Sequence, residues 1–350
     1  MTDLIRSKAR HEFEQAASYT MPPEWVPHEA TWLSYPHAAY TWPGGIEHIF
    51  DAYNEFVRIV STGEKVHILL QDKAAVARIG TALTAAGAVM ANIVLHDVPT
   101  NDAWCRDHGP CFVFAGGHKG IVNWGFNAWG GKYPYTLDDQ VPGYVARYLD
   151  VPQVHPGLIM EGGSIEVNGD GVLMTTESCL LNPNRNPPCS RTDLDIAMRR
   201  FYGVRQIIWL GDGIAGDDTD GHIDDMTRFV SPARVVTAVE QDPSDVNYAP
   251  LRHNREILRR VRLPDGAPLE VVELPMPDPV VYDGQRLPAS YANFYIANAA
   301  VIMPTFRCER DAVARDILQG CFERPVIGVD AYNIIQGLGS FHCLSRQEPQ

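Results

Sequence analysis

Short apolar runs alternate with amphipathic segments along most of the chain. In the middle of the sequence, residues 164–167 and 172–176 are two apolar runs of strand length joined by Asn168-Gly169. Both residues of that pair tolerate a positive φ angle, which a tight hairpin turn requires. The pattern therefore predicts a β-hairpin at this place.

An amphipathic helix and a third strand are predicted directly after this hairpin. Thr192 is placed to cap a helix and Gly203 to end it, and apolar side chains recur between them at helical spacing, at Leu194, Met198 and Phe201. Residues 206–210 then form an apolar run that predicts a buried strand. The predicted unit is strand, strand, helix, strand.

The same order of elements recurs along the chain. One copy is predicted at residues 227–230, 235–239, 254–262 and 269–274. Another has strands at 293–296, 300–303 and 325–329, and a helix with the apolar stripe Val313, Ile317 and Cys321. Looser copies are predicted at residues 111–114, 121–124 and 141–149, and near Thr31 with a helix at 46–60 and a strand at 66–70. Five copies average about 70 residues each, a period that favours radial or solenoid stacking over two separate domains.

Charge narrows the range of partners. The 350 residues include 43 Asp or Glu and 29 Lys or Arg, which gives a formal net charge of −14, and 45% are hydrophobic. This composition is typical of a globular protein with a large core. The negative balance argues against nucleic acid and is compatible with a cationic partner.

Residues 1–18 are charged without a signal core, and no apolar stretch reaches membrane-helix length, so we expect a cytoplasmic protein that binds no membrane.

The cysteines predict a reduced protein without a structural metal. There are seven, an odd number without a Cys-x-x-Cys pair: Cys105, Cys111, Cys179, Cys189, Cys308, Cys321 and Cys343. That spacing fits neither a disulfide framework nor a zinc site. Buried cysteines usually act as small hydrophobic residues, but Cys343 lies beside His342 after a Gly-rich stretch that allows the backbone to approach a ligand closely. Cys343 is therefore a candidate thiolate.

The acidic segment 211–225 invites several interpretations. Gly211–Gly216 follows a predicted strand and matches the dinucleotide-binding fingerprint, but the acidic run after it lacks a helical period and would repel a pyrophosphate. A calcium loop fails because Gly216 and Thr227 would stand where acids are required. A transition metal at His222 and Asp224 stays an alternative, although no second histidine lies at ligand spacing. On an extended backbone these two side chains point to the same face.

Acidic residues beside glycine precede the first strand of several predicted modules. Asp107 follows Trp104 on a turn before one module, Glu161 stands before the next, and Asp224 belongs to the acidic segment before another. If the modules pack around one axis, their starting points converge. Function would then lie at the shared centre of the modules.

Eight ordered motifs make the chain similar to the agmatine deiminases, which belong to the guanidine-modifying superfamily of pentein folds and to the peptidylarginine deiminase-like family of the Porphyromonas type. The motifs are Met21–Trp25, Asn101–Pro110, Phe126–Gly131, Glu161–Ile165, Leu180–Pro187, Asp220–Asp224, Pro288–Asn298 and Gly339–Cys343. The resemblance spans nearly the whole chain. It implies an α/β fold in which five strand–strand–helix–strand (ββαβ) modules form a pseudo-symmetric propeller around a central active site, within a single catalytic domain of residues 1–350.

The resemblance also implies roles for individual residues. Cys343 looks like the nucleophile and His222 like the general acid/base, with Glu161 holding its imidazole. Asp107 and Asp224 match the carboxylates that grip the guanidinium, and Trp104 matches the aromatic lining of the substrate channel. The implied reaction converts agmatine and water to N-carbamoylputrescine and ammonia in putrescine and polyamine biosynthesis, through a covalent thiouronium intermediate. It needs no metal or organic cofactor.

The resemblance leaves some features open. Leu338, Ser340 and Phe341 depart from the Gly-Gly-Asn and Ile of the family's commonest nucleophile motif, and Cys105 and His108 stand where Met and Thr are frequent. These departures put the substrate tail in question more than the reaction.

Several functions remain as alternatives. One is a deiminase of the same chemistry that acts on peptidyl arginine, free arginine or another small guanidino compound. A second is a nucleotide-dependent oxidoreductase that uses Gly211–Gly216. A third is a binding module without activity, against which the intact set of candidate catalytic residues argues. Since the family often forms oligomers, we also expect a homodimer or a larger homo-oligomer.

Overall fold

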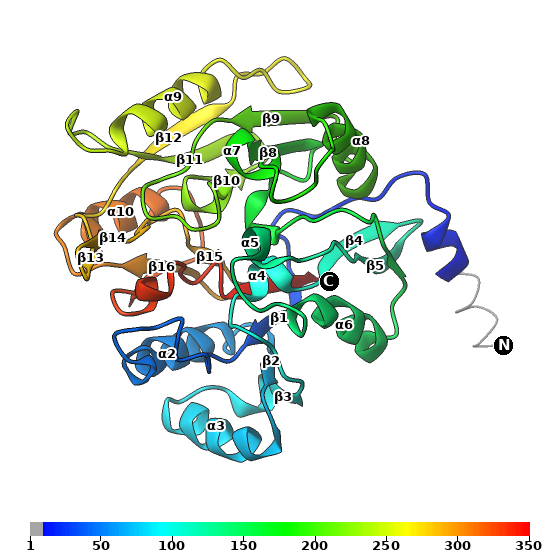
Figure 1. Ribbon diagram of the computed structural model, residues 1–350, viewed down its shortest axis with the longest axis vertical. Coiled ribbons are helices and arrows are strands. Elements are labelled where there is room, and N and C mark those ends of the chain that lie inside the picture. The colour runs from blue at the N-terminus through cyan, green and yellow to red at the C-terminus, as the bar shows by residue number, and fades with distance from the viewer. Residues whose placement is uncertain (1–9) are drawn as a thin grey trace.

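The computed structural model describes residues 10–350, and Figure 1 shows their sheets arranged in a ring around a central region. Within these residues the strands form five sheets of three or four strands and one two-stranded ribbon, β13 (Val281–Tyr282) with β14 (Gln285–Arg286). The sheets follow one another around the ring in chain order (Figure 1). Residues 1–9, the first part of the charged N-terminal stretch, lie outside the described range.

Four of the sheets share one topology. Their strands are β4 (Cys111–Ala115), β5 (His118–Val122) and β6 (Gln153–Val154); β7 (Glu166–Val167), β8 (Val172–Thr176) and β9 (Gln206–Leu210); β10 (Thr227–Ser231), β11 (Arg234–Val239) and β12 (Glu270–Pro275); and β15 (Tyr295–Ile296), β16 (Val301–Thr305) and β17 (Val326–Asp330). In each, the first two strands pair antiparallel and the third pairs parallel to the second. This is the predicted module.

A helix connects the second and third strands of each of these four modules. The helices are α6 (Val141–Leu149), α8 (Arg191–Tyr202), α9 (Tyr248–Leu258) and α10 (Arg310–Gln319). Figure 1 places them on the outer side of the ring. A parallel pair of strands requires such a crossover. The strand starts consequently face the centre, and the helices shield the sheets from solvent.

The chain termini together build the remaining sheet. Its strand order is β18 (Ser345–Pro349), β1 (His28–Ser34), β2 (Lys65–Leu70) and β3 (Ile93–Asp97). The helix α2 (Phe50–Val60), which a 3-10 turn η1 (Ile46–Ile49) precedes, and the helix α3 (Lys73–Ala85) make the connections. The antiparallel pairing of β18 with β1 closes the ring. The five predicted modules are thus confirmed, with the first strand of the first module supplied by the C-terminus.

The sequence pattern missed β18 because Ser345–Pro349 has no hydrophobic side chain. The strand is nevertheless buried along its whole length. Several of its polar groups have partners inside the protein: the Nε of Arg346 donates to the oxygen of Pro110 at 2.7 Å, and Oε2 of Glu348 accepts from Trp32 Nε1 at 2.9 Å. Periodicity cannot identify a buried strand of this kind. The pattern also missed α3 and β3, which extend the first sheet.

Two helix boundaries differ from the prediction. Ser190, not Thr192, caps α8: its hydroxyl accepts from the backbone of Asp193, whose carboxylate accepts in turn from the Ser190 backbone. The helix predicted at 254–262 runs instead from Tyr248 to Leu258. The reciprocal bonds of a capping box outweigh the preference of a single Thr.

The apolar stripe predicted for α10 was wrong in its register. Val313 is 53% exposed, and Ile317 and Cys321 are only half-buried. Ala314 and Leu318 are instead the fully buried side chains of that helix. The two stripes are offset by one residue on the helix surface. Packing against β17, not side-chain hydrophobicity alone, decided which face turned inward.

The core is divided among the sheets. Its largest cluster joins the first and fifth sheets through buried residues that include Leu33, Phe56, Val66, Phe294 and Ile302. None of the helices within residues 10–350 is long and apolar enough to cross a membrane.

Candidate active site

The segments that precede the strands converge at the centre of the ring. They are the short helix α4 (Cys105–His108) before β4, the 3-10 turn η4 (Gly162–Ser164) before β7, the 3-10 turn η5 (Ile223–Asp225) before β10, residues 291–294 before β15, and residues 340–344 before β18. They bring side chains far apart in sequence into contact. The convergence expected from packing around one axis is therefore present.

Cys343 lies at the inner end of this centre, with 5% of its surface exposed. Its Sγ accepts from Asn293 Nδ2 at 2.9 Å and lies 3.6 Å from Oδ2 of Asp224. Burial raises the pKa of the thiol well above its usual value, and Asp224, Asp225 and Asp107 raise that pKa further. The thiol is therefore neutral while the site contains no cation.

Asp107 is held by two donors. Its Oδ1 accepts from the backbone N–H of Gly163 at 2.8 Å, and its Oδ2 accepts from Trp129 Nε1 at 2.9 Å. Burial, reinforced by Glu161, raises the pKa of Asp107 to about 7 despite these hydrogen bonds. A Cβ at Gly163 would lie 2.6 Å from His222 Nδ1 and 2.9 Å from Asp107 Oδ1. Only glycine fits between these groups.

The indole of Trp129 reaches Asp107 from a strained turn. Trp129 has φ 54° and ψ 40°, inside the short helix α5 (Ala128–Gly131), and Ala128 before it has φ 50°. Side chains other than glycine rarely adopt this left-handed conformation, which costs roughly 1–3 kcal/mol per residue. Strain of this kind is concentrated at functional sites, where the surrounding structure holds it.

His222 and Asp224 face Asp107 from the neighbouring module. Nδ1 of His222 lies 3.8 Å from Asp107 Oδ1 and 3.9 Å from Asp224 Oδ1. The sequence predicted that these two side chains point to the same face because their backbone is extended. They do lie close together, but the backbone from Ile223 to Asp225 is the 3-10 turn η5, so the reason given for the prediction was wrong. Burial, with Arg185, lowers the pKa of His222 well below its usual value, and burial, with Asp107, raises that of Asp224 well above its own.

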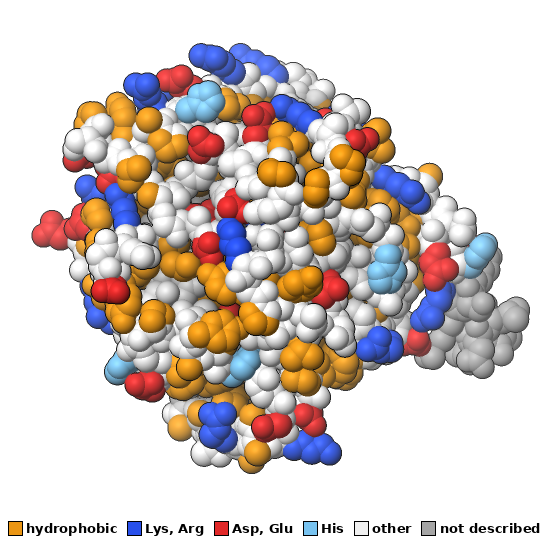
Figure 2. Space-filling view, viewed as in Figure 1, with side chains coloured by type: hydrophobic (Ala, Val, Ile, Leu, Met, Phe, Trp, Pro, Cys, Tyr) orange, Lys and Arg blue, Asp and Glu red, His pale blue; other side chains and the backbone are white. Residues whose placement is uncertain are grey.

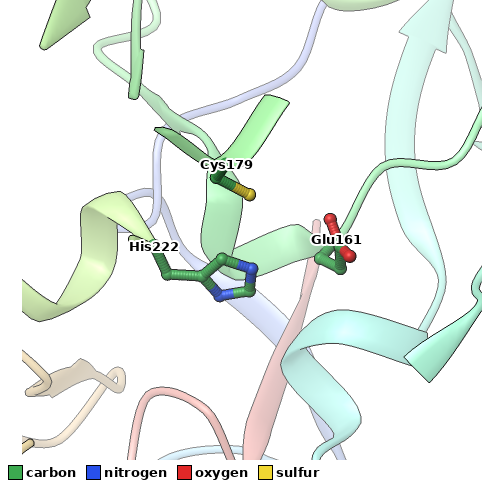
Figure 3. Close-up of side chains that lie close together, drawn as sticks. All are labelled: Glu161, Cys179 and His222. Atoms are coloured by element: carbon green, nitrogen blue, oxygen red, sulfur yellow. The ribbon is translucent and has the colours of Figure 1, made fainter. Parts of the chain in front are cut away.

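Glu161 does not form the predicted contact with the imidazole of His222 in this structure. Its Oε1 accepts from Arg185 Nε at 2.6 Å, its Oε2 has no hydrogen-bond partner among residues 10–350, and neither ring nitrogen of His222 has one. Figure 3 shows one ring nitrogen of His222 directed toward Glu161 and Cys179. Ligand atoms of the three side chains lie within 4.8 Å of one another. Arg185, which the sequence analysis did not single out, is therefore the residue that holds Glu161.

Two side-chain groups have spacings that resemble metal sites. They are Glu161, Cys179 and His222, and Asp224, Asp225 and Cys343. The guanidinium of Arg185 is bound to Glu161, and a buried cation at this position opposes a divalent ion. We assign no metal to either group.

The Gly-rich segment does not form a nucleotide site. Residues 211–222 are a loop without a following α-helix, and a Cβ at Gly213 would lie 2.5 Å from Gly221 Cα. A Cβ at Gly216 would lie 2.2 Å from the oxygen of Arg286. These glycines are therefore required by the packing of the loop. A dinucleotide site also needs a helix whose N-terminus binds the pyrophosphate, and no α-helix directly follows residues 211–222.

A cavity of about 300 Å³ leads from Cys343 and Asp107 to the surface. Trp104 and Trp129 line its inner part, and Tyr133, Tyr282 and Asp218 line its outer part. Acidic side chains lie beside a hollow near the centre of the face in Figure 2. Trp104 therefore lies where the prediction placed it, along the path to the thiol.

Of the unusual residues near the nucleophile, only Leu338 lines this cavity. Phe341 stacks on Phe56 in the core at a ring-centroid distance of 5.1 Å, and Ser340 is fully buried. Gly339 packs so closely on Trp104 that a Cβ would lie 2.6 Å from its ring. The departures from the commonest family motif thus change the core more than the substrate path.

His342 and Glu24 form a second layer behind the site. Nδ1 of His342 lies 2.7 Å from Asp224 Oδ2, and its Nε2 lies 2.8 Å from Glu24 Oε2. Glu24 also accepts from Arg106 and Arg228 at 2.9 and 3.0 Å. Sequence reasoning missed this group. The residues lie in motifs that carried the resemblance, but nothing in a linear pattern joins Glu24 to His342.

The family model of the Porphyromonas-type peptidyl-arginine deiminases matches residues 20–349. The chain belongs to this family. It is 35% identical to the agmatine deiminase of Ectopseudomonas mendocina over 367 aligned positions, which cover 96% of both chains.

Solved structures of this family share the fold. The agmatine deiminase of Enterococcus faecalis superposes with a TM-score of 0.89 at 29% identity, covering 95% of this chain and 96% of that one. A C. jejuni agmatine deiminase with substrate bound superposes with a TM-score of 0.86 at 32% identity, with the same coverage. The pentein fold expected from the resemblance is confirmed.

Proposed function

We propose that this protein hydrolyses agmatine to N-carbamoylputrescine and ammonia. The observation that carries the proposal is the position of Cys343 beside two buried carboxylates and His222, at the inner end of an acidic cavity. A guanidinium is planar and cationic, and resonance makes its carbon a poor target for water. Two carboxylates can hold its N–H groups and fix the plane of that carbon against a thiolate.

Asp107 and Asp224 are the proposed guanidinium clamp. Both carboxyl groups are buried, and each has at least one oxygen close to the Nδ1 of His222. Because burial raises both pKa values, the two carboxyl groups are not both ionised in the empty site. A cation bound between them lowers both pKa values, so that both groups become carboxylates. The positive charge of the substrate also favours the Cys343 thiolate over the thiol.

The first half-reaction begins when the bound cation lets the Cys343 thiol pass its proton to the neutral imidazole of His222, and the resulting thiolate adds to the guanidinium carbon. His222 then donates a proton to the departing nitrogen, the C–N bond breaks, and ammonia leaves a thiouronium adduct on the sulfur. Asn293 Nδ2, which donates to Sγ at 2.9 Å, steadies the sulfur before the attack. In this role Asn293 stabilises the developing thiolate.

The second half-reaction returns the enzyme to its starting state. The imidazole of His222 removes a proton from water, and the hydroxide adds to the adduct carbon. The C–S bond then breaks and the hydroxyl proton passes to the departing sulfur, which releases the ureido product and restores the thiol. The proton on His222 is lost to the solvent. Glu161 orients His222 in this scheme. Its unpartnered Oε2 and the unpartnered ring nitrogens of His222 lie close enough for a small rotation to join them.

The lining of the cavity favours agmatine over free arginine. Among the described residues that line it there are four aspartates, Asp102, Asp107, Asp218 and Asp283, and there is no Lys, Arg or His. Lys132 contacts this lining, but its ammonium group is already paired with Asp218 at 3.3 Å and with Asp220 at 3.0 Å, so the α-carboxylate of arginine would meet mainly like charge. The distal ammonium of agmatine meets acidic groups and the aromatic faces of Tyr133 and Tyr282 instead.

We extend the proposal to the setting of the enzyme. The whole chain acts as one catalytic domain, located in the cytoplasm, and supplies a step of putrescine and polyamine synthesis. A homodimer or a larger homo-oligomer is expected from the family's habit of oligomerising. Gel filtration with light scattering tests the oligomeric state.

A substrate panel tests the proposed function. Ammonia release by the purified protein is measured with agmatine, free arginine and an arginine-containing peptide, and we expect kcat/KM to be greatest for agmatine. Activity on another guanidine with none on agmatine would refute the substrate assignment. Full turnover by Cys343→Ala would refute the covalent mechanism, and Cys111→Ala, which removes a buried thiol that packs in a hydrophobic cluster of the core, is the matched control.

A further inference from the structure

The imidazole of His342 lies buried between two carboxylates. Its exposed fraction is 1%, and its two ring nitrogens lie 2.7 Å from Asp224 Oδ2 and 2.8 Å from Glu24 Oε2. Both distances are those of short charge-assisted hydrogen bonds. Asp224 belongs to the proposed guanidinium clamp, and neither Asp224 nor His342 is among the residues that line the cavity.

These two contacts fix the number of protons in the group. A ring nitrogen and a carboxylate oxygen both carry lone pairs, so each contact needs one hydrogen between its two atoms. Asp224, His342 and Glu24 therefore share two protons. Either His342 is an imidazolium between two carboxylates, or it is neutral and one carboxyl group is protonated.

Glu24 is the permanent anion of the group. It accepts from Arg106 Nη2 at 2.9 Å, from Arg228 Nη2 at 3.0 Å and from the backbone N–H of Ile296 at 2.9 Å, in addition to His342. Burial alone would raise the pKa of Glu24, but Arg228, His342 and Arg106 outweigh it and hold that pKa well below its usual range. One shared proton is therefore on His342 Nε2.

The second proton lies between His342 Nδ1 and Asp224 Oδ2. Asp224 lies beside Asp107 and Asp225, and its Oδ1 has no hydrogen-bond partner among the described residues. Burial lowers the pKa of His342, and Arg106 and Arg228, which bind Glu24, lower it further. The two arginines also oppose the rise in the pKa of Asp224, but burial and Asp107 outweigh them there. The acidic neighbours favour a protonated Asp224, and the two arginines favour a neutral imidazole. In the empty site, the proton is consequently on the carboxyl group.

We propose that His342 is a positioning residue that takes the proton of Asp224 when a guanidinium binds. The O–H bond of Asp224 breaks and an N–H bond forms at Nδ1, so the clamp becomes anionic while the proton stays inside the protein. The positive charge of the bound guanidinium favours an ionised Asp224, and this drives the proton from Asp224 to His342. This inference rests on the proposed function only in that the ligand carries a guanidinium.

The charged groups around His342 are consistent with this exchange. Glu24 and Asp224 face its two nitrogens, and Arg106, whose Nε donates to the His342 backbone oxygen at 3.2 Å, and Arg228 lie beside Glu24. Asn293 accepts from the His342 backbone N–H at 3.1 Å and cannot titrate. An imidazolium formed here keeps Glu24 as its counter-ion.

Proton counting by calorimetry tests the proposal. Agmatine is titrated into Cys343→Ala protein, which lacks the thiol proton and turnover, in two buffers of different ionisation enthalpy at one pH. The same titration uses Cys343→Ala/His342→Gln, whose amide can accept a hydrogen bond but cannot take up a proton. The control is Cys343→Ala/His28→Gln, because His28 is also buried and bonded to a glutamate but does not touch Asp224.

We expect the His342→Gln protein to release about one proton more to the buffer than the other two, since no internal group then takes up the Asp224 proton. An equal count in all three proteins would overturn the proposal. If His342→Gln does not fold, ¹⁵N NMR of the Cys343→Ala protein decides: the His342 ring must change from neutral to imidazolium when agmatine binds, and an unchanged ring refutes the inference.

A second probe separates this inference from the substrate assignment. Methylguanidinium carries the same cationic group without a distal ammonium. Binding of methylguanidinium but not of agmatine would refute the proposed substrate while the proton count is still measured. If neither compound binds, the clamp itself is wrong and the inference fails with it.

Discussion

Asp107→Asn should make the protein more stable at alkaline pH while abolishing its activity. The pKa of Asp107 is raised to about 7 by burial and by Glu161, against about 3.9 in an unfolded chain. The folded protein therefore binds this proton more tightly than the unfolded chain does. Stability from this group is fully present below about pH 4 and is lost as the pH rises to about 7.

The size of the effect follows from the difference in pKa. Compared with a neutral side chain, Asp107 lowers the stability by about 4 kcal/mol at pH 8 and by about 1–2 kcal/mol at pH 5, where it is protonated in the folded protein and ionised only in the unfolded chain. An Asn side chain carries no charge, but its NH₂ group faces either the Gly163 N–H or the Trp129 indole, which costs about 1–2 kcal/mol. The net gain is about 2–3 kcal/mol at pH 8 and near zero at pH 5. For a chain of this length it corresponds to roughly 3–4 °C in Tm.

Thermal unfolding at pH 5 and pH 8 measures this gain, and ammonia release measures the activity. We expect kcat/KM to fall by roughly 100-fold or more, because one of the two clamp carboxylates is lost. A Tm below that of the wild type at pH 8, or an equal gain at both pH values, would refute the reasoning. Asp220→Asn is the control of opposite sign, since Asn184, Arg185 and Lys132 outweigh burial and lower the pKa of Asp220.

Three further substitutions probe the contacts of the site. Trp129→Phe removes the indole donor to Asp107, so kcat/KM should fall by about 10- to 100-fold. Because this hydrogen bond lowers the pKa of Asp107, the acidic limb of the pH profile should also move above about pH 7. A limb at the same pH as in the wild type would contradict the contact. Asn293→Ala removes the donor to the Cys343 sulfur and should slow its alkylation by iodoacetamide about 10-fold, whereas an unchanged rate would exclude this role. Asp218→Asn should raise KM for agmatine but not for methylguanidine, and an equal effect on both would place Asp218 away from the distal ammonium.

The modular organisation could be predicted from the sequence because hydrophobic periodicity is a local property. Hairpins such as the one around Asn168 and helices such as α8 depend on residues within a short window. Where the prediction failed, non-local contacts decided the outcome. Ala314 and Leu318 turned inward in place of Val313 because α10 packs on a neighbouring strand.

The candidate site was only partly accessible from the sequence. The family motifs implied roles for Cys343, Asp107 and Asp224, which the local pattern marked only as a candidate thiolate and as acids before predicted strands. They did not identify Asn293, Trp129 or Arg185, whose hydrogen bonds to site residues span between 22 and 50 positions of the chain. No local pattern distinguishes such residues from structural polar ones.

By itself, the sequence determined the repeated module, the family resemblance and the residue types that carry the chemistry. The tertiary structure alone decided that β18 closes the ring, that Glu161 binds Arg185, and that His342 bonds to Asp224 and to Glu24, which lie 118 and 318 positions away from it. The physical reason is that apolar periodicity acts along the chain, whereas buried charges are stabilised by partners that only the closed ring brings into contact.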